Sequence, residues 1–514
     1  MNLRTRTENA KKNILVGLAS QIIILALSFV GRKLFVRFLS IDYLGINGLY
    51  SNILSVLSLA ELGLGSVVTF SLYKPVFENN QPIIRALIKY YRKVYIVIAL
   101  IVSGIGVALI PYLRYIVKSN LAETELIFYY VLFLIDAVMT YYIAHKVALL
   151  AANQENRIQR YVDILSAFIQ QICHIVILLL FPNYILYVAS TVFVTLISKV
   201  IMNIVINDKY SYIRQPDTHD IEINKKSITK NIKSTAVYKL STVLINSTDN
   251  ILISIIVNTA AIGLYSNYYM IVNALRGFIT IITSAISNGV GNLYAQKSND
   301  RILEVFNTLV LLYHFVSCFC AISMFFIFND FITIWIGEAY LFDKQIVFAI
   351  SFNFYLTNLL TPIWSFREST GQFVKAKYIM LITALLNIVL SIVLGIPLGV
   401  FGILIATALS KILTQVWYEP RILFKNVFHE PPKIYWASQL KNVICTVICV
   451  IVSMMISNAF SSSIFSIFVK GILFFVVCFS VFFVAHFKDD EINTINGFIS
   501  MISRTKAKDI VRYF

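Results

Sequence analysis

Long runs of apolar residues constrain this chain more than any other feature of its sequence. Stretches such as Ile96–Ile110 and Ile472–Ala485 contain few polar side chains, and comparable runs recur throughout the chain. A helix needs about 20 predominantly apolar residues to cross the core of a bilayer. Only 13% of the 514 residues are charged, which is about half the share in a soluble domain. The sequence therefore predicts an all-α, polytopic membrane protein.

The 20-residue criterion gives about fourteen expected transmembrane helices. They are placed at 14–39, 44–70, 94–113, 126–149, 161–181, 184–206, 236–257, 261–290, 303–328, 345–366, 378–397, 400–418, 438–458 and 463–486. A polar stretch after the sixth span indicates a linker between two lobes. The expected organisation is an N-lobe of six spans (1–206), a cytoplasmic linker (207–235), a C-lobe of six spans (236–425), and two additional C-terminal spans with a basic tail (426–514).

The connecting segments alternate between rich and poor in Lys and Arg. The poor side holds only Arg114, Lys118 and Lys344. The positive-inside rule makes the rich side cytoplasmic, so both termini are expected in the cytoplasm. The formal net charge of +17 then reflects topology. Because these cations are scattered over many short loops, we expect no nucleic-acid partner.

The six cysteines lie inside apolar runs or at their ends, without a CxxC spacing or a Cys/His cluster. We interpret them as small apolar residues rather than disulfide partners or metal ligands. No Walker A motif is present in the sequence, so ATP hydrolysis by this chain is not expected. We expect no cofactor, no bound metal and no catalytic residue.

The pentapeptide GLYSN occurs twice, at Gly48–Asn52 and at Gly263–Asn267, 215 residues apart. Each copy lies at the start of an even-numbered expected span, just after a short exterior turn. Parallel repeats related by an axis along the membrane normal are a transporter architecture. We therefore expect two six-helix lobes related by a pseudo-twofold axis.

The residues around both copies resemble a known family. Leu39–Pro75 resembles the second-span region of bacterial polysaccharide flippases, and Ser247–Leu275 resembles the corresponding region of their second lobe. These flippases are the oligosaccharide-lipid branch of the multidrug/oligosaccharidyl-lipid/polysaccharide exporter superfamily. The resemblance implies a central cavity that works by alternating access. The implied activity moves an undecaprenyl-diphosphate-linked oligosaccharide from the inner to the outer leaflet of the bacterial plasma membrane.

Charged residues inside the expected spans are the candidate functional residues, because a charge at the bilayer centre costs at least about 2.5–3.5 kcal/mol. Arg32, Lys33 and Arg276 are predicted to bind the diphosphate, since Arg can bind phosphate oxygens with two donors at once. Asp136 is the candidate for proton or ion coupling. The alternative for each residue is a structural ion pair or a side chain that reaches the interface.

The repeat offset also brings opposite charges into correspondence. Glu61 corresponds to Arg276, and Lys33 corresponds to the residue before Asp249. We expect two gates made of ion pairs between the lobes, with Arg32 or Lys33 facing Asp249 and Glu61 facing Arg276. The alternative is that each carboxylate pairs with a cation of its own lobe and keeps that partner.

Two other functions are compatible with a polytopic chain of this kind. A drug or organic-cation exporter of the same superfamily would favour an acidic cavity without cations. A polytopic glycan polymerase or glycosyltransferase usually needs a sizeable outer loop, which the sequence lacks. We therefore expect a monomeric transporter rather than an enzyme. Its expected partners are the lipid-linked oligosaccharide, membrane lipids and other polysaccharide-assembly membrane proteins.

Overall fold

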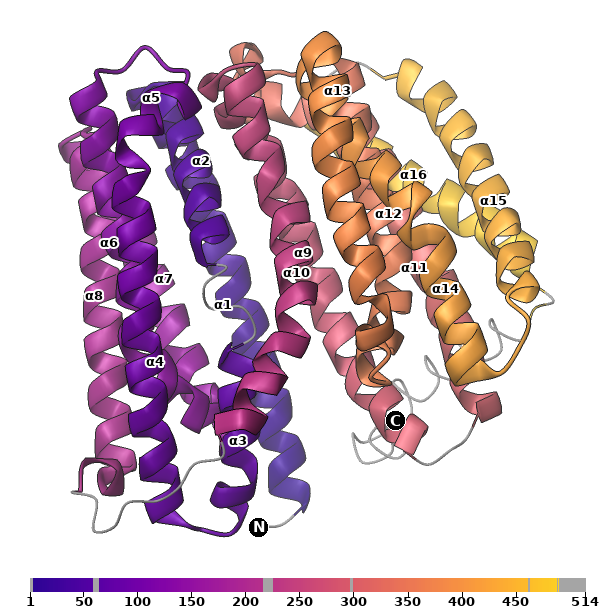
Figure 1. The fold of residues 1–514 in the computed structure, drawn as a ribbon. Helices are drawn as coiled ribbons and strands as arrows, with labels where there is room; N and C mark the ends of the chain where they lie inside the picture. Colours follow the sequence, from indigo (N-terminus) through magenta and orange to yellow (C-terminus); the bar gives the residue numbers. More distant parts are fainter. Residues whose placement is uncertain are drawn as a thin grey trace. The chain divides into compact units, whose positions relative to one another are not determined.

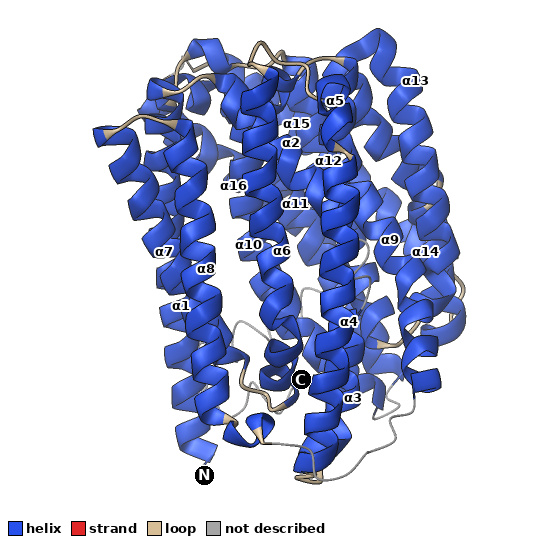
Figure 2. Ribbon diagram, turned by 60° about the vertical axis from the view of Figure 1, so that its left-hand side comes forward, coloured by secondary structure: helices blue, strands red, loops and turns tan. Residues whose placement is uncertain are grey.

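The computed structural model describes residues 3–58, 64–215, 225–295, 299–460, 463–487 and 489. Within these ranges every regular element is a helix (Figures 1 and 2), so the predicted all-α class is confirmed. The α-helices are α1 (Leu3–Phe38), α2 (Ile41–Leu57), α3 (Leu64–Phe77), α4 (Gln81–Ala108), α5 (Leu113–Ile116), α6 (Glu123–Ala152), α7 (Asn156–Leu180), α8 (Tyr184–Lys209), α9 (Lys225–Ile256), α10 (Thr259–Ala295), α11 (Asn299–Trp335), α12 (Lys344–Ser369), α13 (Phe373–Leu413), α14 (Gln415–Leu423), α15 (Lys433–Asn458) and α16 (Ile464–His486).

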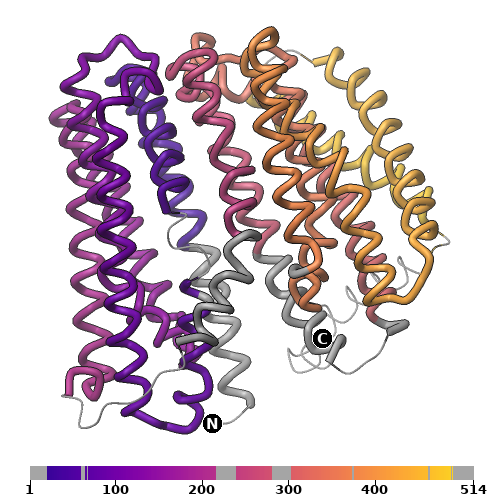
Figure 3. The backbone as a smooth tube through the Cα atoms, viewed as in Figure 1, coloured from indigo at the N-terminus to yellow at the C-terminus, as the bar shows by residue number. Residues whose placement is uncertain are grey.

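Nine helical segments of the described chain are long and apolar enough to cross a membrane. One of them, Lys375–Phe428, is 54 residues long and contains both α13 and α14. The path of the chain through these segments can be followed in Figure 3. The protein is therefore a multi-pass membrane protein, while the count of fourteen spans and the orientation stay predictions.

Contacts divide the chain into two compact units: Leu15–Gly263, here called the N-terminal unit, and Leu264–Phe514 together with Met1–Ile14, here called the C-terminal unit. In the N-terminal unit, α6 packs against α2, α3, α4 and α8. Two buried tyrosines join these helices: Tyr50 donates to the carbonyl of Leu126 at 2.9 Å, and Tyr130 donates to the carbonyl of Gly106 at 3.1 Å. A buried phenol needs such an acceptor, so these bonds fix α2 and α4 on α6.

In the C-terminal unit, α11 packs against α12, α15 and α16. Phe306 of α11 stacks edge-on with Phe366 of α12, with ring centroids 5.1 Å apart. Farther along α11, the buried thiols of Cys318, Cys449 and Cys478 meet, with all sulfur atoms within 4.8 Å of one another. These thiols lie in a cluster of apolar side chains, which is the environment expected for cysteines that act as small apolar residues.

Helix α13 is two helices joined at a sharp reversal. Gly399 has φ +58° and ψ −136°, a backbone conformation that only glycine adopts readily. Hydrogen bonds join the two halves, at 2.9 Å between Asn387 and Thr407 and at 2.7 Å between Thr383 and Thr414. The reversal therefore separates the expected spans 378–397 and 400–418.

The first glycine of each GLYSN copy, Gly48 and Gly263, lies at one contact, which α2 makes with the α9–α10 turn. A Cβ atom at Gly48 would lie 3.0 Å from Ile262, and one at Gly263 would lie 2.5 Å from the carbonyl oxygen of Ile41. Gly45 packs still more tightly on the backbone of the same turn. The absence of side chains permits this close approach of helices. Gly48 and Gly263 both lie in the N-terminal unit, where each permits a close contact.

Candidate functional site

A polar cavity of about 510 Å³ lies in the N-terminal unit, between α2, α6, α7 and α8. All four helices contribute polar side chains to it. These are Asn47, Ser51, Ser55 and Ser58 from the α2 region, Asp136 and Thr140 from α6, Gln170, Gln171 and His174 from α7, and Tyr187 and Thr191 from α8. An ionisable side chain inside a membrane segment, such as Asp136, is by default a candidate for a substrate or ion pathway. This cavity is therefore the candidate functional site.

Asp136 is the carboxylate of the cavity. It lies on the inward face of α6, and its Oδ1 atom is buried without a hydrogen-bond partner. Thr195 and Lys199, both on α8, lie close enough to act on its charge. A carboxylate with an unused acceptor atom in a cavity can bind a proton or a cation that enters.

A group of neutral polar residues forms the wall beside it. His174 Nε2 lies 3.0 Å from the hydroxyl of Thr191, and Gln170 Nε2 donates to the same hydroxyl at 3.2 Å. The buried His174 ring stacks on Tyr187, with centroids 3.7 Å apart. These contacts hold donors and acceptors of α7 and α8 in fixed positions along the cavity.

Arg32 of α1 lies next to this wall. Its guanidinium is half-buried and within electrostatic reach of the Tyr187 phenol. The neighbouring Gly31 faces Gln171 of α7, since a Cβ there would lie 3.5 Å from the amide oxygen. Lys33 is exposed and is not among the residues that line the cavity. Arg32 does not line the cavity either, but it acts electrostatically on Tyr187, which does, and the diphosphate role of both residues stays a prediction.

Arg276, the third predicted diphosphate ligand, lies on α10 in the C-terminal unit. Its Nη1 donates to the hydroxyl of Tyr269 at 3.0 Å, and its guanidinium carbon is 5.5 Å from the centre of the same ring. Its Nε atom is buried without a hydrogen-bond partner. Tyr265 packs against Tyr269 with ring centroids 5.4 Å apart. This arrangement presents a half-buried cation beside aromatic rings.

The two predicted gates stay predictions. Glu61 lies outside the described residues, so its pairing with Arg276 is not addressed by the structure. Asp249 is half-buried on α9, in the same unit as Arg32 and Lys33.

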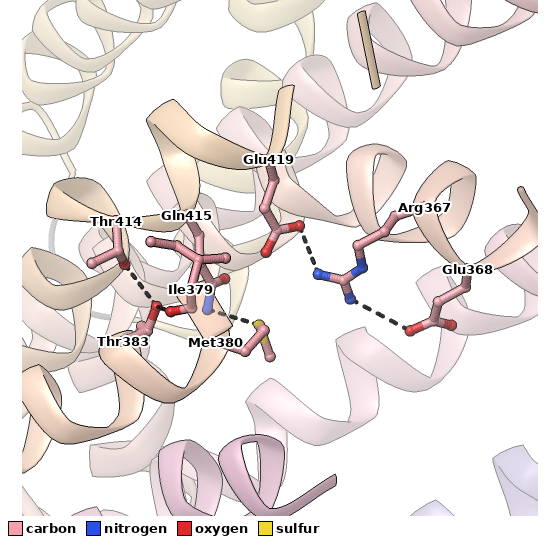
Figure 4. Close-up of polar contacts among 8 residues, drawn as sticks. All are labelled: Arg367, Glu368, Ile379, Met380, Thr383, Thr414, Gln415 and Glu419. Carbon is pink, nitrogen blue, oxygen red and sulfur yellow. Dashed lines mark hydrogen bonds and ion pairs between the residues drawn. The ribbon is translucent and has the colours of Figure 1, made fainter. Parts of the chain in front are cut away.

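The C-terminal unit contains a buried ion pair that was not among the predicted site residues. Arg367 Nη1 lies 2.7 Å from Glu419 Oε2, and the two side chains are 2% and 1% exposed. Figure 4 shows this pair, which joins α12 to α14, and the longer contact of 3.6 Å to the exposed Glu368. Breaking a buried pair leaves one charge uncompensated and is strongly destabilising, so we interpret this pair as a structural link between α12 and α14.

Sequence reasoning missed the neutral members of the cavity. Gln170, Gln171 and His174 interrupt the apolar run of α7 at positions that share one helix face. That periodicity is a readable signal. These side chains carry no formal charge, so a search for charges inside apolar spans does not find them.

A family model described as polysaccharide biosynthesis protein matches residues 10–287, which is more than half of the chain. No curated protein matches the sequence. The lipid II flippase MurJ, in an inward closed conformation, matches with a TM-score of 0.65 at 15% identity, over 92% of this chain and 100% of MurJ. An inward-facing multidrug resistance MATE family transporter matches with a TM-score of 0.62 at 14% identity, over 79% and 98% of the two chains.

A third solved structure, a transporter of the MOP superfamily from Pyrococcus furiosus, matches with a TM-score of 0.55 at 13% identity, over 82% of this chain and 96% of the other. At these identities the likeness concerns the fold alone, which the chain shares with these transporters. Together with the family match over residues 10–287, it confirms the resemblance found in the sequence: the chain belongs to the polysaccharide biosynthesis protein family.

Proposed function

We propose that the protein is a flippase that moves an undecaprenyl-diphosphate-linked oligosaccharide from the inner to the outer leaflet of the bacterial plasma membrane by alternating access. The family and the fold shared with MurJ support a role in lipid-linked glycan transport. One observation carries the choice of substrate. Arg32 acts electrostatically on Tyr187, and Tyr187 lines a cavity whose polar groups are mostly amides and hydroxyls.

The chemistry of the two halves of the substrate fits these groups. The diphosphate carries negative charge, which a guanidinium binds with charge-assisted, bidentate hydrogen bonds. The sugar carries many hydroxyl groups, which neutral amide and hydroxyl side chains such as Gln170 and Thr191 can bind in either direction. In the C-terminal unit, Arg276 and its partner Tyr269 offer groups of the same chemistry: a cation, an aromatic face and a hydroxyl group.

A second function, export of organic cations, is favoured by one residue. The buried carboxylate oxygen of Asp136 has no partner and would attract a cation. In the flippase, the same oxygen would serve as the site for a coupling proton or ion. The two functions therefore assign different ligands to Asp136 but only the flippase needs Arg32.

Replacing Arg32 distinguishes them. We expect Arg32→Ala to lower flipping of lipid-linked oligosaccharide roughly 30-fold, because losing a close charge partner costs about 2 kcal/mol or more. The measurement follows radiolabelled lipid-linked oligosaccharide in vesicles from a knockout strain that expresses each variant. A membrane-impermeant reagent reports which leaflet holds the labelled lipid.

Lys33→Ala is the matched control, because it removes the same charge from the next residue, which is exposed. It should retain most of the activity. Full activity of Arg32→Ala at normal protein levels would refute the role of Arg32. Transport of a cationic dye that needs Asp136 and not Arg32, with no effect on lipid-linked oligosaccharide, would favour the exporter.

A further inference from the structure

A second recess runs along α4, α6 and α8 and is separate from the polar cavity. It encloses about 840 Å³, and the two share no lining residue. In Figure 2, α6 lies between α8 and α4. We call this recess the α4–α6–α8 groove. Most of the side chains that line it are apolar, and many are exposed; Leu100, for example, has 68% of its surface accessible. The other exposed apolar side chains of its lining are Ile96, Val107, Ile135, Tyr142, Leu196 and Val200.

The length of the groove suits a lipid of one leaflet. Its lining on α4 runs from Arg92 to Val107, a distance of about 22 Å along a helix at 1.5 Å per residue. Half of a bilayer core is about 15 Å thick. The groove can therefore hold acyl chains from one leaflet and a headgroup at its end, whereas a longer prenyl chain would extend beyond it.

The end of the groove that lies toward the predicted cytoplasmic side is cationic. Arg92 and Lys199 line it, and the lining contains no Asp or Glu. Asp136 and Asp163 act on Lys199 electrostatically, but both line other recesses. Within the described part of the chain, neither Arg92 nor Lys199 has a carboxylate within ion-pair distance. Two cationic side chains on an otherwise apolar surface favour the binding of an anionic group.

A buried histidine lies at the same end. His145 lines the groove, and its side chain is only 3% exposed. Both of its ring nitrogens are buried without a hydrogen-bond partner, although its ring lies beside that of Tyr95. A buried polar atom without a partner is costly. An anionic oxygen that enters the groove would provide the missing acceptor.

We propose that the α4–α6–α8 groove binds an anionic phospholipid, whose acyl chains lie along the apolar wall and whose phosphate is held by Arg92, Lys199 and His145. The Coulomb attraction, the unpaired histidine and the length of the apolar wall each point to this class of lipid. The proposal does not depend on the substrate of transport, because the groove and the polar cavity have no residue in common.

Native mass spectrometry of the full-length protein, purified in detergent, tests this proposal. Phosphatidylglycerol, phosphatidylcholine and a prenyl phosphate are each titrated against it. We expect phosphatidylglycerol to bind in preference to the other two. The double variant Arg92→Gln/Lys199→Gln should weaken phosphatidylglycerol binding about 25-fold, because each basic residue contributes about a fivefold factor near an anionic lipid surface.

Lys93→Gln is the matched control, since Lys93 is exposed on the same helix and does not line the groove. It should leave the affinity unchanged. If the double variant does not fold, Arg92→Gln alone should give about a fivefold loss, and Ala99→Trp should exclude the lipid by filling the groove. Equal binding of phosphatidylcholine, preference for the prenyl phosphate, or wild-type affinity in the folded groove variants would overturn the proposal.

Discussion

Arg367 and Glu419 carry opposite charges in a region of the C-terminal unit that is almost closed to solvent, and their closest atoms are 2.7 Å apart. Removing one partner leaves the other charge buried and uncompensated, which costs about 3–5 kcal/mol. We therefore expect Glu419→Gln to lower the free energy of unfolding by about that amount. Thermal unfolding of the purified protein in detergent measures the change.

Two controls separate this effect from the loss of any charge. The double variant Arg367→Met/Glu419→Met replaces both charges by apolar groups and should recover most of the stability. Lys74→Gln breaks the exposed contact of 3.8 Å to Glu78 and should change stability by less than about 1 kcal/mol. A Glu419→Gln protein as stable as the wild type would show that the buried pair is not a structural link.

The predicted site residues show what single-residue reasoning can and cannot find. Asp136 and Arg32 are predicted from the sequence because a charge inside an apolar run is costly wherever the helix lies, and their roles stay predictions. His174 and His145 could not be found in this way, since a neutral ring is tolerated in an apolar helix. What marks these histidines is their surroundings: one is hydrogen-bonded in a polar cavity, and the other is unpaired in an apolar groove. Such surroundings exist only once distant helices have packed.

At the level of elements, the positions of the membrane helices follow from hydrophobic runs. The expected spans 126–149 and 438–458 lie within α6 and α15. Helix ends are less predictable: α10 runs for 37 residues against an expected span of 261–290. Hydropathy marks the part of a helix that prefers lipid, whereas the helix itself continues as long as its backbone hydrogen bonds do. The contact of α2 with the α9–α10 turn, at Gly48 and Gly263, was not predictable either, because it arises from packing between helices.

That contact makes a prediction about helix packing. A Cβ atom at Gly45 would collide with the backbone carbonyl of Thr259. Gly45→Ala should therefore push α2 away from the α9–α10 turn and lower stability by about 1–3 kcal/mol. Gly104→Ala on α4 is the control, because no atom lies within 4 Å of its added Cβ and alanine is the better helix former. Equal unfolding temperatures for the two variants would argue against a close contact at Gly45.

At the scale of the whole molecule, the repeat connects the sequence to the proposed transport cycle. Alternating access requires one end of the transporter to be closed while the other is open. The contact of α2 with the α9–α10 turn lies at the predicted outer end, and glycines let its backbones approach closely. Because glycines form this contact, the helices can separate and pack together again with little rearrangement of side chains. We therefore infer that it closes the outer end and parts once in each cycle.

Locking this contact should stop transport. A Cβ atom at Gly48 would lie 3.0 Å from Cγ2 of Ile262, so cysteines at both positions are within reach of a disulfide. In the Gly48→Cys/Ile262→Cys variant, oxidation should reduce flipping of lipid-linked oligosaccharide to background, and reduction should restore it, because the outer end can then open again. Each single cysteine variant should be insensitive to the oxidant, which controls for the native thiols. If the crosslinked protein still moves its substrate at the reduced rate, the contact stays closed throughout the cycle and the outer opening lies elsewhere.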